Sequence, residues 1–475
     1  MFLSPLFRNR GAKGLVLGRR TSRFSPLYVL PEASSETASH VWVCGVSGTG
    51  KSKMLEHLLF QMTANSKGYG LIDPHSMLAD DLIRNLISNG VLLDPKIRER
   101  FIYIDPSRTD FVVPFNVLSS DDEPYDISAG ILESFRRTWP NSLREAAHFS
   151  NVATAALIAL VENDLSLMDM HRLLTNKDFR ERCLEKVTEA SVVEYFHDRY
   201  DRWEREAPAM KESTLNKVGA FSLNPRLRAM LGQKENHLNF AKIIDENKIL
   251  ILDLGRSDGE TNRLIGNLVT TGIERGMRRC RTSHVWSLVI DEFAGFVANE
   301  GSVETLAHVL SESRKHGIAF FALHQNLSQL TPRMLGALSD VQTKIVFAVN
   351  RSDSEQFAKM IGRVDSEAVK RDPKTDIQYE LFEPIANQWE QWVDHIRFQK
   401  PRHALVARQD GDVANIRTIT IPKYSATEDD VEEFKVESLK RYGIPYSEAI
   451  KNLEKPAYEE PVTVIGHPSP GNYGR

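Results

Sequence analysis

Residues 40–59 read HVWVCGVSGTGKSKMLEHLL, and this stretch decides the fold. Its first part, Val41–Cys44, is a short apolar run that stops at a glycine, as a buried strand does. After the glycine-rich turn, apolar residues recur at helical spacing; they are Met54, Leu55, Leu58, Leu59 and Met62. A strand, a tight turn and a helix in this order open an α/β unit.

The turn itself, residues 45–52, reads GVSGTGKS and matches the phosphate-loop pattern GxxxxGK[ST]. Backbone N–H groups of such a loop surround a β-phosphate, and the helix N-terminus adds a favourable dipole. Lys51 would reach the β- and γ-phosphates, and the Ser52 hydroxyl would bind magnesium. A chance glycine turn is the alternative, and the strand-to-helix context argues against it. The predicted nucleotide-binding residues are Gly45, Val46, Ser47, Gly48, Thr49, Gly50, Lys51, Ser52 and Lys53.

A second motif, LVIDE at residues 288–292, places two acids after an apolar strand. Asp291 would hold the magnesium ion, directly or through water, and Glu292 would polarise the attacking water as general base. An acidic pair at a strand end is common by itself, but the phosphate loop upstream favours the catalytic interpretation. The guanine-reading pattern Asn-Lys-x-Asp is missing from the sequence, so we expect ATP rather than GTP.

Apolar runs alternate with helical patterns along much of the chain, which predicts a parallel sheet. The predicted strands cover residues 41–44, 68–73, 101–105, 248–254, 286–290, 318–323 and 344–349. Between residues 121 and 245 the patterns are helical, including one long helix predicted over 179–206. We therefore expect an α/β fold that contains an inserted all-helical domain.

Arg314 and Gln325 follow the acidic pair, and each has two interpretations. Arg314 ends a helix predicted over 303–316, with Gly317 as its C-cap. It either offsets the negative end of the helix dipole or enters the ATP site of a neighbouring subunit as an arginine finger. Gln325 ends a predicted strand, where it either faces solvent or orients the water and reports hydrolysis. The basic run RGMRRCR at 275–281 is either a solvated helix end or a DNA contact.

The composition is that of a soluble globular protein. The 475 residues carry a net charge of −4, which excludes a uniformly basic nucleic-acid coat protein. The longest apolar run, VATAALIALV at 152–161, is about half of the ~20 residues that a membrane-spanning helix needs. The N-terminus shows no signal-peptide pattern. The 3 cysteines match no metal spacing, so we expect reduced thiols and a cytoplasmic location.

With these motifs in this order, the chain resembles the HerA/FtsK superfamily of hexameric motor ATPases, and above all the TraD/TraG-like conjugative coupling ATPases and HerA-like DNA translocases. The segments that carry the resemblance include GLIDPHSMLADDL at 70–82, SLVIDEFAGF at 287–296 and LSESRKHGIAFFALHQNLSQL at 310–330. The chain departs from the family in three respects: membrane helices and an N-terminal β-barrel are not apparent, and Ser76 stands where a glycine is common.

The resemblance implies a RecA-like motor domain, a helical domain between the DPH segment and the acidic pair, and a six-membered ring around DNA. It also implies ATP and Mg as ligands, with Lys51, Ser52 and Asp291 binding phosphate and magnesium. Glu292 would then be catalytic, Gln325 would sense the nucleotide, and Arg314 would act in trans as an arginine finger. The expected segments are a basic N-terminal segment (1–40), a first part of the ATPase core (41–120), the helical insertion (121–245), a second part of the core (246–425) and an acidic, Pro/Gly-containing tail (426–475).

We therefore expect an ATP-hydrolysing hexameric DNA translocase of a conjugation, mobile-element or phage-defence system. Its expected partners are DNA, further copies of itself, and a nuclease, relaxase or secretion-channel protein. The alternative, from a different class, is a nucleotide-switched scaffold that recruits a nuclease or secretion partner.

Overall fold

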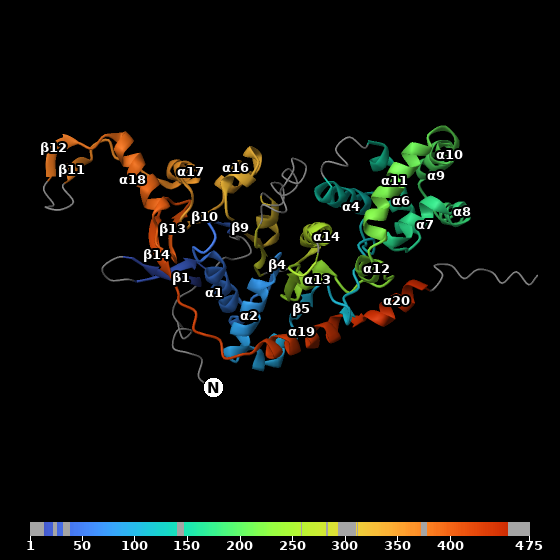
Figure 1. Cartoon of the computed structure of the whole chain (residues 1–475), viewed down its shortest axis with the longest axis horizontal. Helices are drawn as coiled ribbons and strands as arrows, with labels where there is room; N and C mark the ends of the chain where they lie inside the picture. Colours follow the sequence, from blue (N-terminus) through green and yellow to red (C-terminus); the bar gives the residue numbers. More distant parts are fainter. Residues whose placement is uncertain are drawn as a thin grey trace, which may run out of the picture.

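An 11-stranded sheet forms the centre of the protein in the computed structural model, which describes residues 14–21, 26–31, 39–139, 147–257, 259–281, 284–292, 310, 312–371 and 378–454. The sheet occupies one half of an elongated molecule, and a helical domain extends from the other half (Figure 1). The α/β fold with a helical insertion, predicted from the sequence, is confirmed.

The parallel part of the sheet has the order β10-β3-β9-β8-β4-β7-β5. Its strands are β3 (Val41–Cys44), β4 (Tyr69–Asp73), β5 (Phe101–Ile104), β7 (Ile249–Asp253), β8 (Trp286–Ile290), β9 (Ile318–His324) and β10 (Thr343–Val346). Every parallel strand predicted from the sequence is present. They read as continuous apolar runs because nearly every residue in them is buried. Since β9 lies between β3 and β8, the ends of these three strands meet at one edge of the sheet.

Helices cover both faces of this parallel sheet. Figure 1 shows α1 (Lys51–Ala64) and α2 (Met77–Ser88) along one side, with α14 (Gly259–Arg279), α16 (Pro332–Ser339) and α17 (Arg351–Ile361) along the other. The connections after β3 and β4 run in one direction across the sheet, and those that lead to β8, β9 and β10 run in the other. In open α/β sheets a ligand crevice forms at the carboxyl ends of the strands where the direction reverses, which here is beside β3.

An antiparallel extension continues the sheet beyond β10, and the sequence analysis did not predict it. Its strands are β13 (His403–Arg408), β14 (Val413–Thr418), β1 (Gly14–Arg20) and β2 (Leu27–Pro31), in the order β2-β1-β14-β13. The N-terminal segment thus contains strands of the main sheet. The hairpin between β13 and β14 turns at Gly411, whose φ of 87° requires a glycine-like backbone.

Helices make up the described part of residues 121–245, the range predicted for the insertion, and this part contains no strand. Its helices are α4 (Pro124–Thr138), α6 (Ala147–Glu162), α7 (Met170–Thr175), α8 (Lys177–Leu184), α9 (Ala190–Tyr195), α10 (Trp203–Glu206), α11 (Pro208–Ser222), α12 (Pro225–Leu231) and α13 (Phe240–Asp245). The prediction of one helix over 179–206 is wrong. The chain folds back between α8 and α9, and Arg180 Nη2 lies 2.6 Å from Asp201 Oδ1, atoms that a straight helix would hold about 30 Å apart.

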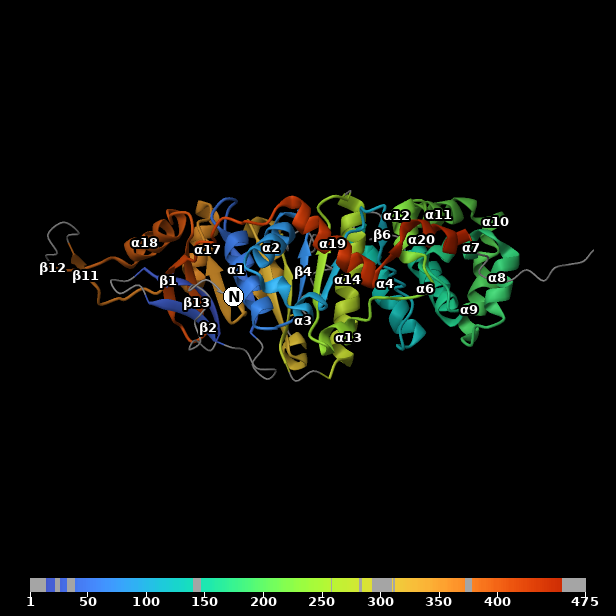
Figure 2. The same ribbon diagram turned by 90° about the horizontal axis from the view of Figure 1, so that it is seen from below.

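The C-terminal segment crosses the molecule from the sheet to the insertion (Figure 2). It contains α19 (Glu428–Tyr442), β15 (Ile444–Pro445), which pairs with β6 (Phe111–Val112), and α20 (Tyr446–Glu454). A capping box formed by Thr427 and Asp430 starts α19, and its acidic first turn suits the positive end of the helix dipole. The helix packs against β5 and α2, and α20 packs against α12. The acidic stretch expected in a tail is therefore the exposed face of a packed helix.

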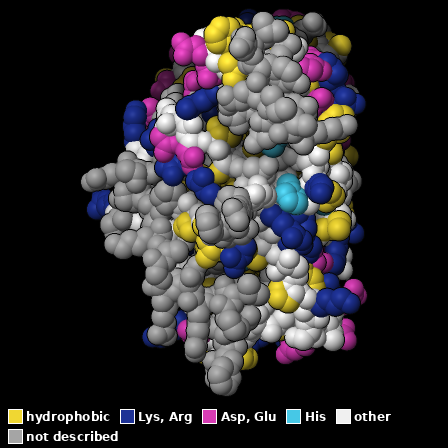
Figure 3. Space-filling model, turned by 90° about the vertical axis from the view of Figure 1, so that its left-hand side faces the viewer, with side chains coloured by type: hydrophobic (Ala, Val, Ile, Leu, Met, Phe, Trp, Pro, Cys, Tyr) yellow, Lys and Arg dark blue, Asp and Glu magenta, His cyan; other side chains and the backbone are white. Residues whose placement is uncertain are grey.

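At the other end of the molecule, α18 (Ile385–Arg397) and the hairpin of β11 (Val369–Arg371) and β12 (Gln378–Phe382) project beyond the antiparallel strands. Figure 3 looks onto this end, where basic side chains gather around a histidine near the centre and acidic side chains lie toward the rim.

Candidate nucleotide site

The phosphate loop connects β3 to α1, and its backbone conformation depends on glycine. Gly48 has a φ of 79° and Gly50 a φ of 107°, both in the region that disfavours residues with a side chain. Gly50 is the residue before the first turn of α1. Among the described residues, no side chain caps this turn and no acidic residue lies within it. Its amide groups and the positive end of the helix dipole are therefore open to an anion.

Lys51 extends into the loop that precedes it. Its Nζ donates to the carbonyl oxygen of Gly45 at 2.5 Å and to that of Val46 at 3.2 Å. Burial lowers the pKa of this ammonium group, and the nearby Asp291 and Glu292 carboxylates oppose that shift. The loop thus holds a buried cation at its centre, where a phosphate oxygen could replace the carbonyl partners. This arrangement fits a nucleotide phosphate.

The acidic pair lies at the carboxyl end of β8, next to the loop. Glu292 has a φ of 51°, a strained conformation for a residue with a side chain, and its Oε2 accepts a hydrogen bond from Gln325 Nε2 at 2.9 Å. Burial raises the pKa of Asp291, and the Glu292 carboxylate also raises it. The hydrogen bond from the Glu292 amide and the charges of Lys51 and His75 lower it. The structure therefore brings Lys51, Asp291, Glu292 and Gln325 together at one edge of the sheet.

The described residues contain no group of three or more His, Cys, Asp or Glu side chains that would enclose a metal ion. Magnesium does not need such a cage, because it commonly binds one or two carboxylates together with substrate phosphates and water. Asp291 and the exposed Ser52 hydroxyl are the donors available for it beside the loop. The donor set is consistent with magnesium that arrives with a nucleotide.

Aspartates end four neighbouring strands at one level of the sheet. In strand order they are Asp291, Asp73, Asp253 and Asp105, and the pairing register aligns them. Burial raises the pKa of Asp73 to about 6, although the amides of His75 and Ala79 donate to its carboxylate. Asp73 therefore fixes the backbone of the turn between β4 and α2, which lies beside the acidic pair.

Ser76, in that same turn, explains one departure from the family pattern. Its φ is 62°, so the position has the left-handed backbone for which glycine is usual. Its hydroxyl donates to Asp253 Oδ1 at 2.5 Å. The serine thus accepts backbone strain and supplies a hydrogen bond to a fully buried carboxylate.

Lys53 was predicted to bind the nucleotide, but its side chain does not extend into the loop. Its Nζ lies 2.8 Å from Glu56 Oε2, 2.6 Å from Asp81 Oδ2 and 2.5 Å from the Tyr424 hydroxyl. The backbone amide in the first turn of α1 is the group of Lys53 that remains available to a phosphate.

Comparisons with known proteins agree with this geometry. Residues 286–389 match the family described as "TraM recognition site of TraD and TraG". The bacterial conjugative coupling protein TrwB is similar in structure over 89% of this chain and 92% of its own, with a TM-score of 0.58 and 16% identity. VirB4 of Thermoanaerobacter pseudethanolicus is similar over 86% of this chain and 97% of its own, with a TM-score of 0.56 and 16% identity.

Residues 286–389 are thus similar in sequence to TraD and TraG, and the fold of the chain is similar to that of TrwB and VirB4. The resemblance inferred from the motifs is thus confirmed at the level of the fold, with a family match over the region from β8 to α18. No curated protein matches the sequence. In the part of the chain that the structure describes, no helix is both long and apolar enough to cross a membrane.

Arg314 lies away from the phosphate loop of its own chain. Most of the helix predicted over 303–316 falls outside the described residues. The described part consists of residues 310 and 312 and a turn, Ser313–His316, that ends at Gly317 with a φ of 70°. This turn precedes the amino end of β9, whereas Glu292 follows the carboxyl end of the parallel neighbour β8. A strand length of roughly 20 Å therefore separates Arg314 from the site in the same chain.

Sequence reasoning missed two residues beside the site. Arg402 precedes β13, and its backbone amide donates to the Thr49 carbonyl at 2.8 Å. His324 ends β9, where Trp42 Nε1 donates to its Nδ1 at 3.1 Å and the two rings stack. His324 lay within a quoted motif, but Arg402 lies about 350 residues from the loop, and only the pairing of β13 with β10 brings it there.

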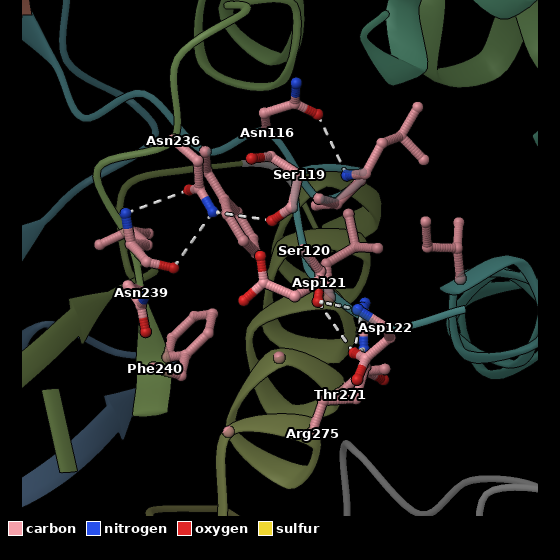
Figure 4. Close-up of a pocket in the computed structure, with 18 of the residues that line it drawn as sticks. Asn116, Ser119, Ser120, Asp121, Asp122, Asn236, Asn239, Phe240, Thr271 and Arg275 are labelled. Atoms are coloured by element: carbon pink, nitrogen blue, oxygen red, sulfur yellow. Dashed lines mark hydrogen bonds and ion pairs between the residues drawn. The ribbon is translucent and has the colours of Figure 1, made fainter. Parts of the chain in front are cut away.

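A cavity of about 580 Å³ lies between the core and the insertion rather than at the phosphate loop. Its polar lining comes from the two connections into the insertion and from α14 (Figure 4). Arg275 and Arg279 both bind Asp122 across its rim, and Arg278 binds Glu274. Arg275 and Arg279 of the basic run thus join α14 to the insertion, whereas Arg278 pairs within α14 itself.

Proposed function

We propose that this chain is an ATP-hydrolysing motor that moves DNA as a hexameric ring in a conjugation, mobile-element or phage-defence system. The observation that carries the proposal is the hydrogen bond between Gln325 and Glu292 beside Asp291 and Lys51. A phosphate-binding cation, a magnesium carboxylate, a general base and a polar group that can report on it are the parts that phosphoryl transfer to water requires.

The ligands of a structural relative support ATP and magnesium. TrwB has been solved with the ATP analogue ADPNP and with ADP and Mg²⁺, at 16% identity to this chain. It has also been solved with the GTP analogue GDPNP. The fold therefore does not distinguish ATP from GTP. We propose ATP because the sequence lacks the guanine-reading motif.

Local positive charge supports a polyanionic substrate despite the net charge of −4. Arg19 of β1 and Arg417 of β14 are cross-strand partners, and His403 of β13 faces Arg417 on the other side. Like charges placed directly opposite each other destabilise a sheet, and nearby phosphates would offset that repulsion. Repetition around a ring would multiply the effect.

The remaining parts of the proposal concern partners and location. The family match over residues 286–389 is described by recognition of TraM, which supports a relaxosome-type partner such as a relaxase, a nuclease or a secretion-channel protein. Cys44, Cys183 and Cys280 are free thiols, which supports the cytoplasm.

The test measures ATP hydrolysis with and without DNA, together with the mass of the assembly in the presence of an ATP analogue. A motor predicts strong stimulation by DNA and a ring of about six subunits. Slow hydrolysis that ignores DNA but changes the binding of a protein partner would reject the motor and favour the nucleotide-switched scaffold.

A further inference from the structure

The phosphate loop has two ends, and the proposed catalytic side chains lie at only one of them. Asp291, Glu292 and Gln325 gather where the γ-phosphate would lie. At the other end, by Gly50 and Lys53, the structure places Arg402 and residues 418–424, which we call the strap. We propose that Arg402 and the strap form the subsite for the nucleoside half of the nucleotide; this inference rests on the proposed function.

The direction of the bound nucleotide follows from the order of groups along the loop. Lys51 serves the β- and γ-phosphates, and the loop amides cradle the α- and β-phosphates. The nucleoside is attached to the α-phosphate, so it must leave the loop on the side away from the acidic pair. Whatever borders the loop there contacts the sugar and base.

Arg402 is held against the loop by its backbone. Its amide donates to the Thr49 carbonyl at 2.8 Å, and its Cα lies 3.4 Å from the point where a Cβ on Gly50 would stand. Its φ of 68° is unfavourable for an arginine, and such strain persists only where surrounding contacts impose it. The contacts are therefore strong enough to fix this residue beside the loop.

Among the described residues, only one of the three guanidinium nitrogens of Arg402 makes hydrogen bonds. Nη2 donates to the Thr418 carbonyl at 2.9 Å and to Thr420 Oγ1 at 2.6 Å. Among the described residues, its Nε and Nη1 donors have no hydrogen-bond partner, and the side chain is half-exposed. A guanidinium has five N–H donors in a rigid plane, and the hydroxyl oxygens of a ribose are suitable acceptors for those left over.

The strap is fixed to α1 at its far end as well. The Tyr424 hydroxyl bonds Lys53 Nζ and both carboxylate oxygens of Glu56, whose side chain is fully buried. Lys53 Nζ also lies 5.0 Å from the centre of the Tyr424 ring. The strap is thus anchored by Arg402 near Thr420 and by α1 near Tyr424, and it forms a wall along the nucleoside side of the loop.

Calorimetry with two probes tests the subsite: Mg-ATP, and magnesium with inorganic tripolyphosphate, which has no nucleoside. For Arg402→Ala we expect ATP affinity to fall by about tenfold or more, the usual effect of losing a hydrogen bond from a charged donor. Tripolyphosphate affinity should stay within about twofold, since the backbone contact with Thr49 remains. Arg402→Lys should restore part of the ATP affinity.

Two matched variants separate the explanations. Thr420→Val removes the bond between Arg402 and the strap side chain but keeps the guanidinium group, so it should lose less ATP affinity than Arg402→Ala does. If Thr420→Val loses as much ATP affinity as Arg402→Ala, Arg402 does not contact the nucleoside directly and only holds the strap in place. Lys51→Ala should weaken both probes.

The inference and the proposed function fail in different ways. If Arg402→Ala weakens both probes equally, or neither, the subsite is wrong although the nucleotide site stands. If the wild-type protein binds neither ATP nor tripolyphosphate, the proposed function itself is wrong.

Discussion

At the residue scale, the bond between Gln325 and Glu292 joins a strand-end amide to the proposed general base. Because Glu292 is also strained at a φ of 51°, its carboxylate has a defined position before any nucleotide arrives. The sequence predicted that both residues end strands, since each follows an apolar run; their roles stay predictions. It could not predict that they contact each other, because that depends on β9 pairing directly with β8.

Glu292→Gln should keep ATP binding and lose turnover by about 10²- to 10⁴-fold, the usual contribution of a positioned base. The amide cannot take a proton from water, whereas Lys51 and the loop amides that hold the phosphates are unchanged. Steady-state hydrolysis and calorimetric binding of ATP measure the two effects separately. Near-wild-type turnover in this variant would remove Glu292 from the role of general base.

His324 should make the protein less stable in mild acid. Burial lowers its pKa from 6.5 to about 3, and the Lys51 charge acts in the same direction. The folded protein therefore binds fewer protons than the unfolded chain, so stability falls as the pH drops from about 6.5 toward about 3. The largest slope from one such group is about 1.4 kcal/mol per pH unit.

Urea unfolding between pH 7 and pH 5 measures this slope. His324→Gln should flatten the pH dependence, whatever it does to stability at pH 7. His171→Gln, which replaces an exposed histidine, is the matched control and should retain the wild-type slope. Burial also lowers the pKa of His40 to about 4, which adds to the loss of stability in acid, whereas the raised pKa of Asp73 opposes it. The difference in slope between the variants therefore isolates the contribution of His324. Parallel slopes in all three proteins would contradict this account of His324.

At the element scale, the sequence predicted those strands whose residues are nearly all apolar, and it did not predict those that contain polar residues. The buried parallel strands stand out as runs, and the bounds of β3 and β8 coincide with the prediction. The antiparallel strands do not: β1 reads GLVLGRR, with glycine and arginine in a strand whose partners come from the far end of the chain. Likewise α19 reads as an acidic run because only Val431, Phe434, Lys435, Ser438 and Leu439 are buried.

Lys435 should be the residue on which the attachment of α19 depends. Its side chain is 1% exposed, and its Nζ contacts Asp80 and lies 3.5 Å from Asp253 Oδ2. Removing the cation in Lys435→Ala leaves the fully buried Asp253 without its positive partner, which typically costs about 3–5 kcal/mol. Lys440→Ala, at an exposed position of the same helix, should change the free energy of unfolding by about 0.5 kcal/mol or less. Equal, small losses in the two variants would show that α19 is held by its apolar contacts alone.

At the scale of the whole molecule, the sheet keeps the two proposed catalytic charges apart. Arg314 lies near His40, whose pKa it helps to lower, at the amino edge of the parallel strands. The phosphate loop and Glu292 lie at the carboxyl edge. A ring in which the amino edge of one subunit approaches the carboxyl edge of the next would unite them, and a single chain does not. The proposed finger thus requires the proposed ring.

Mixed rings test this requirement. Arg314→Ala should bind ATP normally and assemble, yet lose hydrolysis by about 10³-fold or more, as arginine fingers do. Glu292→Gln should be inactive for its own reason. When the two inactive proteins are mixed and allowed to exchange subunits, some interfaces pair an intact Glu292 with an intact Arg314 from the neighbour, so partial hydrolysis should return. If both residues acted within one subunit, every subunit in the mixture would lack one of them, so no recovery would be expected. Well-mixed rings that stay inactive would leave Arg314 as a cation at the end of its turn.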